Sequence, residues 1–169
     1  MKSFNKILIT SLLTLSAFGS VTYMACKKDR CNNVACLNGG SCDNGNCVCT
    51  PGFEGNRCET LSRTKFITNF NGGDSCSYPT DSLGLHNYGV KFLTIANNPT
   101  TMTMRNFLGN PDDSATCYLQ SPDSFIFNGA NNSVTYRGYG KISNDSLYMK
   151  YHVQYDTIPF DCHYLGLRY

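Results

Sequence analysis

The sequence lacks the short motifs that accompany most catalytic sites. It has no Gly-x-Ser-x-Gly, no His-Glu-x-x-His, no phosphate-binding loop and no dinucleotide fingerprint. It also contains only three histidines, and no two of them have the local spacing of zinc ligands. A zinc site would have to be assembled by the fold from His86, His152, His163 and Cys117. We therefore expect no enzyme activity, no metal and no cofactor.

Long apolar runs and basic runs are also missing. The longest largely apolar run, residues 7–18, is too short for a membrane-spanning helix, which needs about 20 apolar residues. It follows Lys2 and Lys6 and precedes small residues that end at Ala25, which is the pattern of a signal peptide covering residues 1–25. Cleavage would leave twelve basic and twelve acidic side chains. Such a neutral chain has no basic stripe to attract nucleic acid.

The residues at the cleavage site, Tyr-Met-Ala-Cys at 23–26, resemble the lipobox of bacterial lipoproteins, with Tyr23 in place of the usual leucine. The resemblance implies that Cys26 becomes the first mature residue and carries acyl chains. The Cys-Lys-Lys-Asp that begins there is similar to lipoproteins of the Bacteroidetes group. Ordinary cleavage after Ala25, with Cys26 in a disulfide, is the alternative. We expect an exported protein anchored by lipid in the outer membrane, on its periplasmic or its outer face.

Six of the ten cysteines fall between residues 31 and 58, in a segment with few apolar side chains. Segments this small fold when cross-links restrict the unfolded chain, so the cysteines indicate a disulfide framework. Six cysteines allow many pairings, and their spacing alone does not choose among them.

The end of this segment carries a family resemblance. Residues 47–58, Cys-Val-Cys-Thr-Pro-Gly-Phe-Glu-Gly-Asn-Arg-Cys, resemble the C-x-C-x-x-G-aromatic-x-G-x-x-C signature of EGF-like domains. The resemblance implies the pairs Cys31–Cys42, Cys36–Cys47 and Cys49–Cys58. Calcium-binding members carry an acidic cluster before the first cysteine, where this chain has Lys-Lys-Asp-Arg, so we expect no calcium.

These features predict a chain of successive parts. They are a signal peptide at 1–25, a lipidated tether at 26–30, an EGF-like domain at 31–58, a linker at 59–63 and an all-β domain at 64–169. Fully stretched, the four residues after Cys26 span about 13 Å. The EGF-like domain would therefore lie close to the membrane and act as a pedestal.

The remainder of the chain has strand-forming residues between turn residues and shows no helical apolar spacing. The chain is thus expected to be mainly β, ending in an antiparallel barrel or sandwich of about eight strands. The expected strands are 65–70, 90–96, 101–107, 115–120, 124–128, 134–142, 147–155 and 161–168.

The clearest register belongs to the hairpin that turns at residues 143–146. Pairing Ile142 with Leu147 makes one face apolar, with glycines that leave room for large partners. The interior is expected to hold Phe125, Phe127, Tyr136, Met149, Tyr151 and Tyr155. The opposite face is polar and is expected to meet solvent.

This solvent-facing side of the hairpin is the candidate binding face. It carries Arg137, Tyr139, Tyr148, Lys150 and His152. Mixed aromatic and cationic faces can stack on sugars or dock proteins, so a protein or glycan is the expected ligand. Ordinary cross-strand pairing is the alternative, because aromatic pairs stabilise sheets.

The remaining cysteines can be sorted by strand alternation. Cys117 shares a face with Ala115 and Leu119, which predicts a small buried side chain. In an up-and-down barrel the first and last strands are neighbours, so a Cys76–Cys162 disulfide is favoured over either pairing with Cys117. This part of the chain also resembles small calycin-like (lipocalin-like) domains of Bacteroidetes lipoproteins. The resemblance rests on the early cysteine, the Gly-Tyr-Gly strand, the Asn-Asp-Ser-Leu turn and the late cysteine.

Four triplets of the form Asp-Ser/Thr-apolar resemble the acceptor used for O-glycosylation in Bacteroidetes. The acceptor hydroxyls would be Ser82, Ser114, Ser146 and Thr157. The alternative is that Asp-Ser simply favours turns.

Together these features predict a lipid-anchored, non-catalytic binding or adhesion module raised on an EGF-like pedestal. One alternative is a calycin-type carrier that holds a small apolar molecule inside the barrel. Another is an inhibitor of a secreted enzyme, acting through an exposed loop at 74–87 or 106–114. The bulk of the expected interior side chains favours surface binding over carriage.

Overall fold

The protein was analysed as a computed structural model, which describes residues 30–77, 82–131 and 134–169. The expected signal peptide and the expected lipidation site, Cys26, lie outside these residues, as does nearly all of the expected tether. Within the described ranges, no helix has the length and apolarity needed to cross a bilayer. Strands dominate, as the composition predicted.

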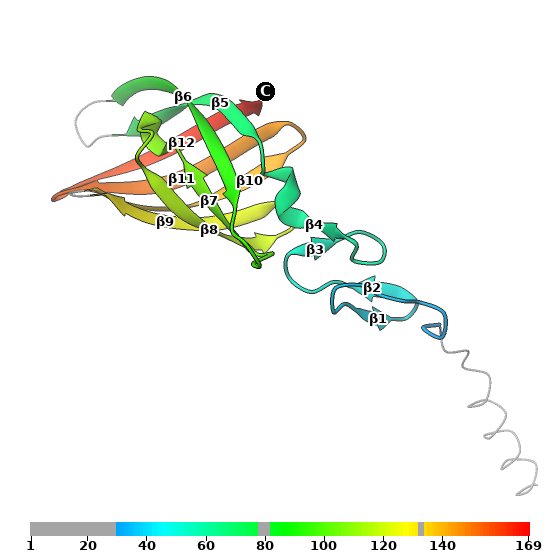
Figure 1. The fold of residues 1–169 in the computed structure, drawn as a ribbon. Coiled ribbons are helices and arrows are strands. Elements are labelled where there is room, and N and C mark those ends of the chain that lie inside the picture. Colours follow the sequence, from blue (N-terminus) through cyan, green and yellow to red (C-terminus); the bar gives the residue numbers. More distant parts are fainter. Residues whose placement is uncertain (1–29, 78–81, 132–133) are drawn as a thin grey trace, which may run out of the picture.

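Residues 31–58 form the disulfide-rich segment, which lies at one end of a larger barrel (Figure 1). It contains β1 (Ser41–Asp43) paired with β2 (Asn46–Val48), and β3 (Phe53–Glu54), which pairs with β4 (Thr60–Leu61) just beyond it. Its disulfides are Cys31–Cys42, Cys36–Cys47 and Cys49–Cys58, the pairs implied by the EGF-like resemblance. Cross-links rather than an apolar core therefore hold this segment together.

The rest of the chain forms a closed antiparallel barrel of eight strands (Figure 1). A short 3₁₀ helix, η1 (Ser62–Lys65), leads into it, and a second one, η2 (Phe107–Gly109), follows its third strand. The strands are β5 (Asn69–Ser77), β6 (Ser82–Thr94), β7 (Thr101–Arg105), β8 (Ser114–Ser121), β9 (Ser124–Asn131), β10 (Val134–Ser143), β11 (Ser146–Tyr155) and β12 (Ile158–Arg168). The predicted fold class is confirmed, and of the two expected forms the chain adopts the barrel.

Closure brings the two ends of the barrel sequence together. β12 pairs with β5, which places Cys162 directly opposite Cys76, and the two form a disulfide. Cys117 is buried and unpaired, as its alternation with Ala115 indicated. The disulfide therefore fastens the seam between the first and last strands.

The β10–β11 hairpin has the register expected from its alternation. Gly140 lies opposite Met149, and Gly138 lies opposite Tyr151. A Cβ atom added to Gly140 would lie 2.1 Å from the ring of Phe125 on the neighbouring β9. Glycine at this position makes room for the phenylalanine, because no larger residue would fit beside the ring.

Three expected elements differ from the structure. The predicted strand at 101–107 is too long, since β7 ends at Arg105 and Phe107 belongs to η2. The predicted strand at 65–70 was wrong, since η1 ends at Lys65 and β5 begins only at Asn69. Between them Phe66 turns into the barrel and is fully buried, so its aromatic character reflects the core and not a strand. The supposed inhibitory loop at 74–87 belongs mostly to β5 and β6, because glycine and asparagine in these strands resemble turn residues in the sequence.

The barrel interior is filled by aromatic rings. At the end near η1, Phe66 packs edge-on against Phe125, with ring centroids 5.3 Å apart. Towards the other end, Phe107 of η2 packs against Tyr136 and Tyr151 at 4.8 Å each. The expected interior residues are buried except Tyr155, which is 54% exposed at the end of β11. That assignment was wrong because the strand continues past the packed interior.

Candidate functional site

A row of outward-facing side chains crosses five neighbouring strands of the barrel. Pairing registers place it in the order Tyr118 on β8, Ile126 on β9, Tyr139 on β10, Lys150 on β11 and His163 on β12. Adjacent strands lie about 4.8 Å apart, so neighbouring side chains in the row are in reach of one another. A continuous surface is therefore assembled from residues far apart in the sequence.

The apolar members of this surface and of the next row form what we call the platform. It consists of Tyr118, Ile126, Tyr139, Tyr148 and Leu165, all 37–60% exposed. The rings of Tyr139 and Tyr148 lie 6.4 Å apart. The Tyr148 hydroxyl lies 2.8 Å from Nδ1 of His163, which fixes the orientation of that ring. Large exposed apolar side chains gathered on one face mark an interaction surface.

Exposed cations surround the tyrosines of the platform. Lys141 and Arg137 flank Tyr139 on β10, and Lys150 lies opposite Tyr139 on β11. Within the described ranges, none of these three cations has a salt-bridge partner. The nearby carboxylate of Asp161 lies 3.1 Å from Nδ1 of His152 instead. The platform therefore lies in a field of positive charge.

All five residues of the predicted binding face lie on this outer surface, as strand alternation indicated. The sequence reasoning missed Tyr118, Ile126, Leu165 and His163. Each of them lies in an expected strand, and alternation also gives its side of the sheet. What was lacking was the register that places these strands beside the hairpin.

The hypothetical zinc ligands are not brought together. Cys117 is buried in the core, whereas His152 and His163 lie on the outer surface. The side chain of His86 lies outside the part of the structure that is described. Burial raises the pKa of the Cys117 thiol well above its ordinary value, so this cysteine stays protonated.

The proposed O-glycosylation positions have different surroundings. Ser114 and Thr157 are exposed, and Ser146 is half-buried at the start of β11. The side chain of Ser82 lies outside the description. Asp113, which precedes Ser114, is buried and accepts a hydrogen bond from Asn131, so this aspartate has a structural role. Glycosylation at these residues stays a prediction.

A buried polar cluster joins three strands inside the barrel. Oδ2 of Asp74 on β5 accepts hydrogen bonds from Tyr151 on β11 at 2.7 Å and from Tyr88 on β6 at 3.3 Å. Burial raises the pKa of both phenols far above the ordinary value, so they remain donors. Oδ1 of Asp74 has no hydrogen-bond partner among the described residues. The cluster holds together strands that are far apart in the sequence.

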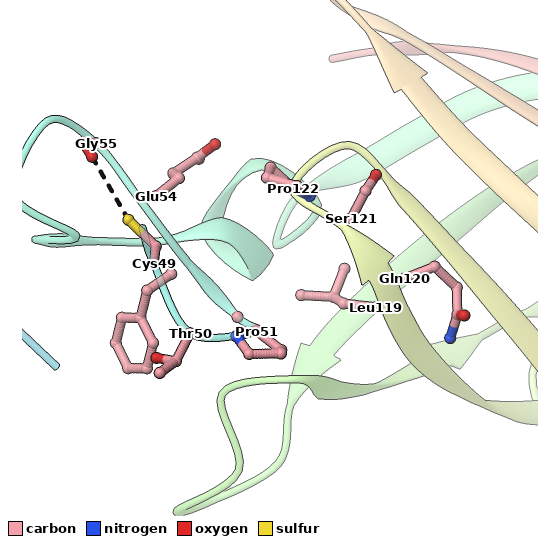
Figure 2. A pocket seen from close by; sticks show the side chains of 11 residues that line it. Cys49, Thr50, Pro51, Glu54, Gly55, Leu119, Gln120, Ser121 and Pro122 are labelled. Atoms are coloured by element: carbon pink, nitrogen blue, oxygen red, sulfur yellow. Dashed lines mark hydrogen bonds between the residues drawn. The ribbon is translucent and has the colours of Figure 1, made fainter. Parts of the chain in front are cut away.

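A hollow lies where the disulfide-rich segment meets the barrel. It is an open cleft of about 470 Å³ lined by residues 49–55 and 119–122. Figure 2 shows Pro51 on one side and Leu119 on the other. Lys65 joins the two parts beside it through Glu54 at 2.7 Å and Asp123 at 2.5 Å. This contact fixes the barrel on the segment, and none of the platform residues lines the cleft.

No family profile matches the chain, and no curated protein resembles it in sequence. Three solved structures that resemble this chain have TM-scores below 0.5. A provisionally assigned outer membrane protein of Bacteroides fragilis has a TM-score of 0.45 at 10% identity, over 63% of this chain and 52% of that one. A protein of unknown function from Bacteroides ovatus has a TM-score of 0.41 at 16% identity, over 60% and 41%. An M. tuberculosis protein has a TM-score of 0.39 at 16% identity, over 65% and 98%. This chain spans about half the length of the first two proteins. At these TM-scores and identities, the similarity assigns no function to it.

Proposed function

We propose that this chain is a lipid-anchored protein of the cell envelope whose barrel binds a ligand through the platform, without catalysis. The single observation that carries the proposal is the platform itself: five large side chains gathered on one wall of the barrel and left exposed. The solvated face of a sheet is normally polar, and a contiguous exposed apolar patch marks an interaction site.

The other features of the chain support this function. The aromatic interior favours surface binding over carriage of a small apolar molecule, because little room is left between the rings. The disulfide-rich segment, which we propose to be an EGF-like pedestal, extends from one end of the barrel, and β1 and β2 form its far tip (Figure 1). A lipid on Cys26 would thus lie beyond the tip and hold the barrel away from the membrane. We propose a calycin-like relationship for the barrel on the sequence resemblance alone.

Replacing Cys26 with serine is expected to abolish membrane attachment. The variant should move from the membrane fraction to the soluble fraction and lose incorporation of labelled palmitate, because serine cannot carry the thioether-linked lipid. Lys27→Ser is the matched control, and it should remain membrane-bound. Membrane retention and palmitate labelling of the Cys26→Ser variant would contradict lipid anchoring at this residue.

Replacing Tyr139 and Tyr148 together with serine is expected to weaken ligand capture at least about tenfold. Exposed aromatic anchors of binding sites commonly contribute more than about 1 kcal/mol each. Binding would be measured on an array of polysaccharides and extracellular proteins. The double variant Tyr155→Ser/Tyr169→Ser is the control, since it removes two exposed tyrosines that lie off the platform. Equal capture by both double variants, with thermal unfolding unchanged, would reject the platform as the binding surface.

A further inference from the structure

A polar pocket adjoins the platform on the same wall of the barrel. Its volume is about 280 Å³, and it is lined by Asn128, Gly129, Thr135, Tyr136, Arg137, His152 and Gln154. The ring of Tyr136 packs inside the barrel, so this residue offers the pocket its backbone. The other large side chains of the lining are all polar.

The strand registers explain why these polar groups converge. Asn128, Arg137 and His152 lie side by side on β9, β10 and β11. Thr135 and Gln154 form the next row towards the end of the barrel. Tyr139 lies two residues from Arg137 on the same face, at a spacing of about 7 Å. The pocket and the aromatic platform are therefore one continuous surface.

The side chains of the pocket are suited to a ligand with hydroxyl and carboxylate groups. Asn128 and Gln154 each offer both an amide donor and an amide acceptor, which suits hydroxyl groups. Arg137 offers a planar set of donors that matches a carboxylate in a two-bond arrangement. Since Arg137 has no salt-bridge partner in the described ranges, its guanidinium is available to a ligand.

We propose that this surface binds an acidic polysaccharide. A uronic acid would place its carboxylate on Arg137 in the pocket, and a neighbouring sugar ring would stack on Tyr139 and Tyr148. Lys141 and Lys150, beside those rings, would attract the further carboxylates of the same chain. This inference rests on the proposed function of the platform and adds to it the ligand class and the role of Arg137.

The pocket favours a glycan over other anionic macromolecules. A stable protein partner needs about 800 Å² of matched surface on each side and does not require a small pocket of amide side chains. Single-stranded nucleic acid also uses aromatic rings and cations, but its binding proteins follow the phosphates with a continuous basic groove. Here the pocket contains a single arginine beside amide and hydroxyl side chains, as one charged sugar requires.

The test compares a polyuronate with the same polymer after its carboxylates have been converted to uncharged methyl esters. Isothermal titration calorimetry of the whole mature protein would use polygalacturonate and its methyl ester, with alginate and hyaluronate as further polyuronates. We expect binding to at least one polyuronate, and loss of at least about tenfold in affinity for polygalacturonate in Arg137→Ala, since Arg137 makes charge-assisted hydrogen bonds. Arg105→Ala is the matched control, because Arg105 is an exposed arginine on β7. It should bind like the unchanged protein.

The possible results separate this inference from the proposed function. Equal affinity for polygalacturonate and its methyl ester, or equal losses in Arg137→Ala and Arg105→Ala, would overturn the assignment of a carboxylate to Arg137. If binding of these polymers nevertheless required Tyr139 and Tyr148, the platform would remain the binding surface. No binding to any of the three polyuronates, or tighter binding to single-stranded DNA than to all of them, would overturn the glycan class.

Discussion

Replacing both Cys76 and Cys162 with alanine is expected to lower the free energy of unfolding of the barrel by about 4–5 kcal/mol. The disulfide joins residues 86 positions apart, so its removal greatly enlarges the set of conformations open to the unfolded chain. It also releases the seam between β5 and β12, where the sheet closes. Denaturant unfolding of the double variant and the unchanged protein would measure the difference.

The reactivity of Cys117 provides an independent measure of how often the barrel opens when the disulfide is removed. This thiol is buried and its raised pKa keeps it protonated, so it should react with an alkylating reagent only when the barrel opens. Alkylation of Cys117, located by peptide mapping, should be faster in the double variant by about a thousandfold. A loss of stability below about 1 kcal/mol would contradict the role given to the disulfide.

Replacing Phe107 with alanine is expected to cost about 3–5 kcal/mol of stability. The ring is fully buried and contacts Phe127 as well as Tyr136 and Tyr151. Its neighbours Asn106 and Leu108 both have φ near +60°, a left-handed conformation that costs about 1 kcal/mol or more for such residues. Burial of Phe107 offsets this strain, so the truncated chain loses packing and keeps the unfavourable turn.

The same variant tests whether the packed interior excludes small ligands. Removal of the ring should leave a cavity between aromatic side chains, and an apolar fluorescent probe should bind the variant more tightly than the unchanged protein. Tyr155→Ala is the control, because that aromatic side chain is more than half exposed. It should change neither stability nor probe binding appreciably. Equal probe binding by the unchanged protein and Phe107→Ala would argue for a cavity that is already open.

Local patterns account for the parts of the fold that were predicted. In the β10–β11 hairpin, a short turn and strict alternation fix the register, so each glycine could be matched to its large partner before the structure was known. The same alternation gave the burial of Cys117 and the outward direction of Arg137, Tyr139 and Tyr148. The connectivity argument for up-and-down barrels then pointed to the pair Cys76–Cys162.

The mistaken elements show where local patterns mislead. Phe66 directly follows the 3₁₀ helix η1 and Phe107 begins η2, yet both are buried because their rings fill the two ends of the barrel. Nothing in their immediate neighbours distinguishes them from strand residues. Asp74 was assigned to a loop, although its carboxylate is bonded by tyrosines from β6 and β11. The place of Asp74 in the barrel interior became evident only when the structure showed the two tyrosines that donate hydrogen bonds to it.

The sequence by itself determined the disulfide framework, the β class and the two faces of each clear strand. These depend on composition, cysteine spacing and a side-chain period of two, which neighbouring residues are sufficient to establish. Tertiary structure alone decided that Tyr118, Ile126 and Leu165 join the tyrosines of the hairpin, and that Asn128 and Gln154 meet at Arg137. The reason is physical: a surface that crosses five strands depends on pairing registers between distant segments, and only closure of the barrel fixes all of them together.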